Sequence, residues 1–308
     1  MSIEVARVFF LILIACASTG HVIAQGLYLP SVYKASFGDG FKTDKYKTGY
    51  YDRYQDADNL VGVEYSRNHF QMGDWYSKGN QVSVISKNTD QSGTTKNLTV
   101  GYNTLETVNA VWTADASYSK RLHEKTTAEI TYNRDRVEVQ QSLMTRVVAN
   151  NYNVSVEHAI LAAMKMQFTL GETRYTDGNH RPLAKIKMTY DVLPEQGVNL
   201  QLRSRYFKNT DTGVTSGYFN PYRFVENIAA IEFNRTVSSW NLSANVGYGR
   251  QAGGDDAKTL AKAFEFSATK PIANCIYIKA KAGYFRSLGY NGPDFIYRYV
   301  SEDVIVVF

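Results

Sequence analysis

Histidine is the side chain used most often for acid–base chemistry near neutral pH. Beyond residue 24 the histidines are His69, His123, His158 and His180. Sequence order alone would allow one of them to meet a carboxylate and a hydroxyl in a Ser-His-Asp site. No Gly-x-Ser-x-Gly, His-Glu-x-x-His, phosphate-loop or paired-cysteine motif accompanies them. The sequence therefore predicts no enzyme, no cofactor and no metal site.

Charged side chains recur at every second position in several stretches, which places them on one face of a β-strand. The basic ones are Lys185, Lys187, Arg203, Arg205, Lys279 and Lys281. The acidic ones are Glu129, Asp135, Glu157, Glu232 and Glu265. Inside a channel such residues set selectivity, and the basic group favours an anionic or partly anionic solute. A polar face that merely contacts water explains the same pattern equally well.

The stretches that carry these residues alternate between apolar and polar side chains. Between 198 and 206 the even positions are mostly apolar and the odd positions polar or cationic. Similar candidate strands cover 45–54, 58–67, 69–77, 80–88, 96–104, 107–119, 125–136, 137–147, 151–158, 163–175, 183–192, 197–208, 223–235, 238–250, 258–270, 275–287 and 295–308. Small polar residues on one face and aliphatic or aromatic residues on the other indicate a wet lumen and a lipid-facing exterior.

The fold class expected is therefore all-β, a transmembrane antiparallel up-and-down β-barrel of about 16 strands. Composition agrees, because 23 tyrosines, 15 phenylalanines and only 6 prolines accompany a mean hydropathy of −0.33. A soluble, secreted all-β protein is the alternative. The breaks at 88–93 and 251–256 are predicted to be extracellular loops.

Residues 1–24 resemble a secretory signal peptide, with a short apolar run after Arg7 and cleavage expected after Ala24. The run ending at Cys16 also resembles a lipobox, so lipidation at Cys16 is the competing interpretation. We expect a lead-in segment at 25–44 and the barrel at 45–308. Bacterial outer-membrane localisation follows from this organisation.

The chain ends in Phe308, preceded by the alternating Val304 and Val306. This pattern is similar to the signal that the bacterial barrel-assembly machinery reads. Glu302 falls on the face that should be apolar, so a bulge or register shift is expected near it.

Two loop motifs stand out. The first, Tyr175 to Arg181, contains Asp177, Gly178, Asn179 and Arg181, and the second contains Tyr218, Phe219, Asn220 and Pro221. Gly and Asn tolerate positive φ, and Asp accepts backbone hydrogen bonds, so the first motif predicts a tight turn. The aromatic pair of the second motif is expected either to anchor at the membrane interface or to stack on sugar rings.

The two motifs, in this order and spacing, resemble the C-terminal barrel of exopolysaccharide-export outer-membrane proteins of the poly-N-acetylglucosamine and cellulose secretion type. The resemblance implies a sixteen-stranded porin-like conduit for an exopolysaccharide. Members of that family carry periplasmic tetratricopeptide repeats, which are missing here, so a separate repeat protein is an expected partner.

The expected partners are outer-membrane lipid or lipopolysaccharide, a polysaccharide substrate and the assembly machinery, with no nucleic acid. The net charge of +5 fits contact with lipopolysaccharide or an anionic ligand. The basic residues argue against the cationic polymer of the poly-N-acetylglucosamine exporter. The alternatives are a plugged structural barrel that scaffolds a secretion complex and, less favoured, an outer-membrane hydrolase.

Overall fold

The computed structural model describes residues 24–106, 108–214, 217–254, 258–273, 275–289 and 292–308. The expected signal peptide therefore lies outside the described residues, apart from Ala24. The described residues form sixteen strands, one short α-helix and one 3-10 turn. No helix among them is long and apolar enough to cross a membrane.

The strands are β1 (Gly26–Phe37), β2 (Lys42–Asp56), β3 (Asn59–Met72), β4 (Trp75–Thr89), β5 (Thr95–Leu105), β6 (Val108–His123), β7 (Thr126–Arg136), β8 (Val148–Leu161), β9 (Met164–Tyr175), β10 (His180–Leu193), β11 (Val198–Lys208), β12 (Arg223–Val237), β13 (Trp240–Gly253), β14 (Thr259–Ala273), β15 (Ile276–Gly289) and β16 (Gly292–Val307). The helix α2 covers Gln140–Met144, and the 3-10 turn η1 covers Pro194–Gln196.

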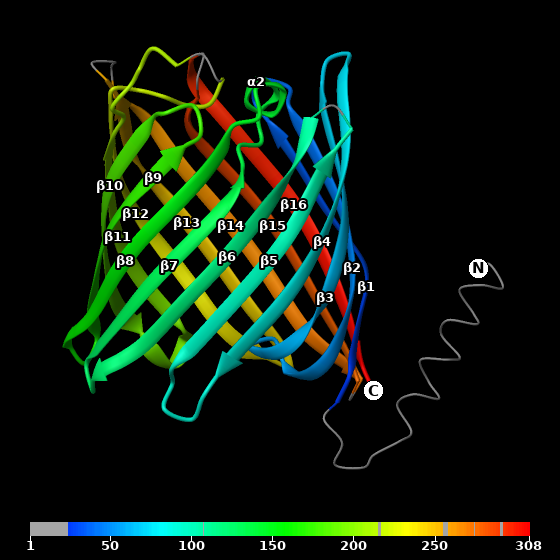
Figure 1. Cartoon of the computed structure of the whole chain (residues 1–308). Helices are drawn as coiled ribbons and strands as arrows, with labels where there is room; N and C mark the ends of the chain where they lie inside the picture. Colours follow the sequence, from blue (N-terminus) through cyan, green and yellow to red (C-terminus); the bar gives the residue numbers. More distant parts are fainter. Residues whose placement is uncertain (1–23, 107, 215–216, 255–257, 274, 290–291) are drawn as a thin grey trace.

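Each strand pairs antiparallel with the next, and β1 pairs with β16, so the sheet closes into a barrel (Figure 1). Closure leaves no strand edge with unpaired backbone groups, which is what a strand in lipid requires. Where the ring closes, the N–H of Gln25 donates to the carbonyl of Phe308 at 2.9 Å. The predicted antiparallel barrel of about sixteen strands is confirmed.

Three segments differ from expectation. The first strand, β1, occupies much of the expected lead-in 25–44, and a pairing irregularity between Tyr28 and Val32 breaks the alternation that would have revealed it. The predicted strand 69–77 is divided by a turn at Gly73, whose φ of +56° suits glycine. The predicted strand 137–147 is instead a loop that contains α2, because its apolar residues pack at the barrel mouth.

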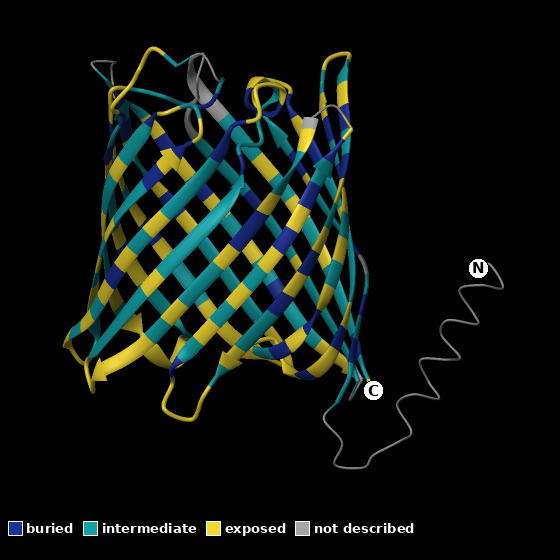
Figure 2. Ribbon diagram, in the orientation of Figure 1, coloured by how far each residue is buried: buried dark blue, intermediate teal, exposed yellow. Residues whose placement is uncertain are grey.

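The outer face of the barrel is apolar. Val84, Val154 and Val246 are more than half exposed, although each lies within a regular strand. Directly paired residues share a face, so the register carries this outward set from strand to strand. Figure 2 shows exposed and less exposed residues alternating along the strands. Apolar side chains that would be buried in a soluble sandwich face outward, as the membrane interpretation predicts.

Glu302 is an exception on this outer face. It pairs with Ala280 in an unbroken stretch of the β15–β16 register. On its other side, where β16 pairs with β1, a register shift lies between the pairs Tyr28/Ile305 and Val32/Glu302, so the shift expected near it is present. Val300, two residues away on the same face, is 55% exposed. The carboxylate therefore points outward from the apolar wall instead of being turned inward.

The two ends of the barrel differ in loop length. The β4–β5 turn at 89–95 lies at the end where β1 begins and β16 finishes, while the β13–β14 loop at 253–259 lies at the opposite end. The prediction that both are extracellular is therefore wrong for the first. The longest connections, 136–148 and 208–223, share the end that is opposite to the start of β1 and the finish of β16 (Figure 1). We assign this end as extracellular.

Candidate functional site

The lumen wall carries a compact basic group on β10 and β11. Lys185 lies directly opposite Arg205, and Lys187 directly opposite Arg203. Like charges in directly opposed positions destabilise a sheet. Glu226 accepts from Arg205 at 3.1 Å, and Gln201 accepts from Arg203 at 2.8 Å, which relieves only part of this repulsion.

Glu232, another predicted lumen residue, joins this group indirectly. Its carboxylate accepts a short hydrogen bond from Gln201, which in turn accepts from Arg203. The structure thus brings five of the predicted residues together on neighbouring strands, namely Lys185, Lys187, Arg203, Arg205 and Glu232. Four cations against two nearby carboxylates leave this wall of the lumen net positive.

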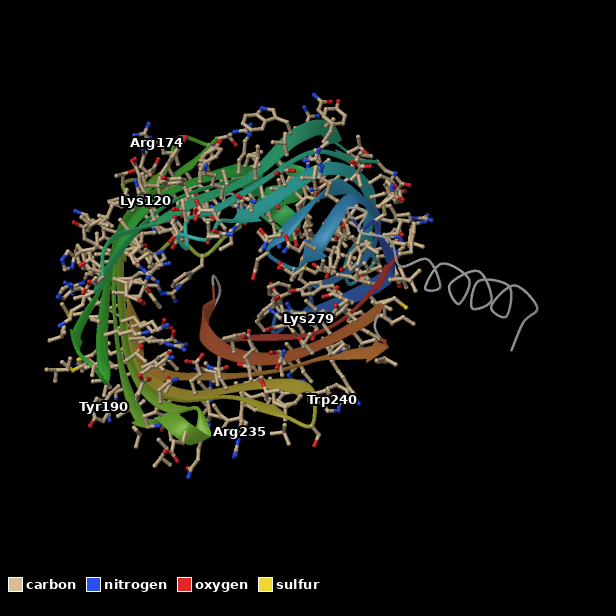
Figure 3. The ribbon with its side chains drawn as sticks, turned by 90° about the horizontal axis from the view of Figure 1, so that it is seen from below. Lys120, Arg174, Tyr190, Arg235, Trp240 and Lys279 are labelled. Atoms are coloured by element: carbon tan, nitrogen blue, oxygen red, sulfur yellow. The ribbon has the colours of Figure 1, made fainter. Side chains whose placement is uncertain are left out.

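Lys279 and Lys281 form a second basic patch on β15, separated from the first by β12 to β14. They line a cavity of 520 Å³ together with Glu265, Ser267 and other polar residues. Viewed from the periplasmic end, Lys279 points into the ring while Tyr190 and Trp240 point away from it (Figure 3). The six predicted cations therefore form two patches at different places on the lumen wall.

The acidic residue Glu129 lies on another wall of the barrel. In the register it is flanked by Ser119 on β6 and Ser155 on β8. Asp115 on β6 and Glu157 on β8 share its inward face. The lumen is therefore acidic along β6 to β8 and basic along β10 and β11.

A belt of amide and hydroxyl side chains crosses the inner face from β4 to β9, and it was not recognised as a unit from the sequence. We call it the amide belt: Gln81, Ser83, Asn97, Asn103, Thr113, Ser117, Thr131, Asn133, Asn151, Asn153, Ser155, Thr169 and Thr173. For example, Thr173 donates to Asn151 at 2.6 Å, and Asn151 donates to Asn133 at 3.2 Å. The signal in the sequence was the recurrence of these residue types at alternate positions.

The first loop motif forms the predicted turn between β9 and β10. Gly178 has a φ of +93°, and the side chain of Asp177 accepts from the N–H of Asn179 at 3.1 Å. The N–H of Gly178 donates to the carbonyl of Tyr175 at 3.1 Å. The turn chemistry expected of this motif is confirmed.

Asn179 joins the first motif to the second. It is fully buried, and its amide donates to the hydroxyl of Tyr218 at 3.0 Å and to the side chain of Asn220 at 2.8 Å. The side-chain oxygen of Asn179 accepts a hydrogen bond from the backbone N–H of Asp211 at 3.0 Å. The Tyr218 ring stacks on Tyr175 with 4.3 Å between centroids. Burial raises the pKa of the Tyr218 phenol, so the hydroxyl stays neutral.

Arg181 completes the junction. Its guanidinium donates to the side chain of Asn209 at 2.7 Å and to the carbonyl of Phe219, and it lies 4.5 Å from the Phe207 ring centroid. Asn209 in turn donates to the carbonyl of Pro221. We call this junction the loop clamp: Tyr175, Asp177, Asn179, Arg181, Asn209, Tyr218, Phe219, Asn220 and Pro221.

The loop clamp determines how far the two aromatic rings of the second motif, Tyr218 and Phe219, are buried. Tyr218 is only 5% exposed, and Phe219 packs edge-on against Phe207 and Phe224. Tyr218 is therefore buried within the loop contacts, and Phe219 is partly buried in the aromatic cluster of Phe207 and Phe224. The loop clamp holds the long loop, residues 209–222, against the barrel mouth.

A second loop folds inward over the same mouth. In this helical loop, residues 137–147, Leu143 packs against the inward-facing Phe70 and Leu105. Glu138 pairs with Lys45 of β2 at 2.6 Å, although β3 to β6 separate β2 from β7. A Cβ at Gly217 would lie 2.4 Å from the Cβ of Gln141, so the helical and long loops are in contact. Together they narrow the extracellular mouth.

The histidines are spread over the barrel. His180 pairs with Glu172 at 3.1 Å, and His158 contacts the Thr126 hydroxyl at 2.9 Å at the other end of the barrel. His69 packs on Tyr46 and Tyr76. Among the described residues, no group of three or more His, Cys, Asp or Glu side chains is placed to hold a metal ion.

A closed barrel with an apolar outer face and a polar, charged lumen defines a transmembrane protein of the porin-like class. No known family model matches the sequence, and no curated protein does. The fold is similar to that of the "Bacterial polysaccharide outer membrane secretin", with a TM-score of 0.69 and 13% identity over 94% of this chain and 100% of that chain.

Pseudomonas aeruginosa OccK11 (OpdR) has a TM-score of 0.48 and 10% identity over 92% of this chain and 96% of its own. OmpF of Salmonella typhi, in complex with daunomycin, has a TM-score of 0.46 and 10% identity over 92% of this chain and 97% of its own. The chain is a bacterial outer-membrane β-barrel protein with a porin-like architecture.

The basic patch on β15 gives a test of lumen electrostatics. Lys279→Glu combined with Lys281→Glu should move the anion-to-cation permeability ratio towards cations by about threefold or more, because fixed charge on a channel wall selects counter-ions. The reversal potential across a bilayer in a KCl gradient measures this ratio. Lys120→Glu, on the outer face, is the matched control and should leave it unchanged. An unchanged reversal potential in the double variant would mean that ions pass without meeting this patch.

Proposed function

We propose that the protein is a porin-like conduit that exports an exopolysaccharide or a related saccharide across the outer membrane. The amide belt carries this proposal. Amide and hydroxyl groups both donate and accept hydrogen bonds, so a wall of them can exchange partners with the hydroxyls of a sugar chain as it moves.

The arrangement of the lumen also supports passage. In the view along the barrel, the drawn side chains leave an open region within the ring (Figure 3). The solved structure of similar fold is described as a polysaccharide outer membrane secretin, and the loop motifs resemble those of exopolysaccharide exporters. The net-positive wall at Lys187 and Arg203 favours a neutral or partly anionic polymer over a cationic one.

A second candidate function is a plugged barrel that scaffolds a secretion complex. The contact of the helical loop with the long loop favours it, because both cover the mouth. Under either function, the proposed partners are outer-membrane lipid or lipopolysaccharide, the barrel-assembly machinery and a separate periplasmic repeat protein.

Bilayer recording of the purified full chain separates the two functions. The conduit should show steady single-channel current, and neutral or anionic oligosaccharides should block it more strongly than polyethylene glycol of equal hydrodynamic radius. Cationic chitosan oligomers should block less than anionic oligosaccharides of the same length. Complete absence of current would contradict the conduit and favour the scaffold. Current with equal block by saccharide and polyethylene glycol would leave a porin without a saccharide role.

A further inference from the structure

Four aromatic rings lie side by side on the inner wall where the barrel closes. They belong to Tyr33 on β1, Phe285 on β15, and Tyr297 and Tyr299 on β16. Neighbouring centroids are 5.6 to 6.4 Å apart, and the planes differ by only 5° to 28°. We call this group the aromatic platform.

The register places all four rings on the lumen face. Tyr299 pairs with Gly283, and Tyr297 pairs with Phe285. Arg298, which lies between the two tyrosines on β16, pairs with Tyr284 on the outer face. Tyr33 pairs with Ser301, which lies on the same inward face of β16 as Tyr299. The first strand, β1, therefore meets the last two, β15 and β16, to build one continuous surface.

The Tyr299 ring lies over a glycine of the neighbouring strand. A Cβ at Gly283 would come within 2.2 Å of this ring, so the ring occupies the space that glycine leaves open. The near-parallel planes stack the four rings against one another along the wall.

The platform differs from the aromatic cluster below it. Tyr28, Tyr51 and Tyr54 are 3% to 6% exposed and pack with Leu60 into a closed core. The four platform rings are only partly buried and retain surface towards the lumen. Leaving aromatic surface exposed to water gives up burial free energy, which points to a binding role.

Polar groups border the platform. The Tyr299 hydroxyl donates to Glu265, and the Lys45 ammonium lies 5.9 Å from the Tyr33 ring centroid. Lys45 is also the partner of Glu138 from the helical loop. An aromatic surface with carboxylate and ammonium groups at its edge suits a ligand that has an apolar face and a hydroxyl rim.

We propose that the aromatic platform is a saccharide-binding site on which pyranose rings stack as the polymer crosses the lumen. A pyranose with equatorial hydroxyls presents C–H groups on its faces and hydroxyls at its edge, which matches the platform and its border. β16 and β8 lie half a ring apart, so the amide belt is on the opposite wall. The site rests on the proposed conduit and adds the class of ligand and the residues that hold it.

The test compares saccharide block in bilayers for three proteins: the wild type, the triple variant Phe285→Leu, Tyr297→Leu, Tyr299→Leu, and the outward-facing control Tyr152→Leu, Tyr248→Leu. Probes are neutral cello-oligosaccharides and size-matched polyethylene glycol. The triple variant should need roughly tenfold more oligosaccharide for half-block, since stacking on each aromatic ring contributes substantially to affinity. Its open-channel conductance and its block by polyethylene glycol should be preserved, and the control should behave as wild type.

Two further measurements keep the result decisive if the triple variant folds poorly. Tyr297→Phe retains a ring and should retain wild-type block, whereas Tyr297→Leu alone should weaken it. In Phe285→Trp, saccharide should change the tryptophan emission relative to wild type. Equal block by Tyr297→Phe and Tyr297→Leu, or unchanged emission, would overturn the platform while leaving the conduit intact. A wild type that carries no current would instead overturn the conduit.

Discussion

Replacement of residues 138–146 by Asn-Gly should raise single-channel conductance by about twofold or more. The replacement removes α2, with its buried Ser142 and Leu143, from the extracellular mouth. The narrowest segment of a pore dominates its resistance, so widening this mouth should increase current. The remaining ends are close enough to join, because the N–H of Val137 already donates to the carbonyl of Val147 at 3.1 Å. Asn-Gly favours the two-residue turn that joins paired strands.

The measurement is single-channel recording in symmetric salt, with heat-modifiable gel mobility to show that the barrel is folded. Lys45→Gln is a useful comparison, because it removes the partner of Glu138 and keeps the helical loop. It should give more frequent transitions between conductance levels rather than a uniformly wider pore. Unchanged conductance in the Asn-Gly variant would place the narrowest point elsewhere in the lumen.

Asn179→Ala should release the long loop from the barrel mouth. The substitution removes two donated bonds, to Tyr218 and Asn220, and two accepted bonds, from the Asp211 N–H and the Thr210 hydroxyl. It leaves the polar groups of these partners without them. Breaking a buried network of this kind costs about 1–3 kcal/mol per unsatisfied group. Since the strands around it are paired through their backbones, we expect this cost to fall on the loop rather than on the barrel.

Limited proteolysis from the extracellular side measures the effect. Cleavage within residues 209–222 should be at least about tenfold faster than in wild type, the ratio that corresponds to ~1.4 kcal/mol of lost local stability. Thr212→Ala, at an exposed position of the same loop, is the control. Arg181→Lys should also accelerate cleavage, because an ammonium cannot replace the planar fork that contacts Asn209 and Phe219. Equal cleavage of wild type and Asn179→Ala would show that the long loop is held by other contacts.

Alternation along the strands was sufficient to predict the membrane barrel and its inward-facing charges. Lys187, Arg203 and Glu129 all lie on the face assigned to them, since a period of two fixes side-chain direction wherever a strand is regular. Prediction failed where the period is interrupted. The irregularity between Tyr28 and Val32 concealed β1, and the apolar residues around Leu143 imitated a strand although they belong to a loop.

The sequence by itself determined the barrel, its polar interior and the turn at Gly178, because these depend on residues close together in the chain. Only the tertiary structure decided what distant residues do together. Closure of the barrel places the ring centroids of Tyr33 and Tyr299 5.8 Å apart. Folding of the loops allows the Asn179 amide to donate a hydrogen bond to the Tyr218 hydroxyl. The motif aromatics therefore became a loop clamp, and aromatic residues outside the motifs became the platform. Pairing of the first strand with the last sets the Tyr33–Tyr299 contact, and packing between two loops sets the Asn179–Tyr218 contact, so no local pattern encodes either.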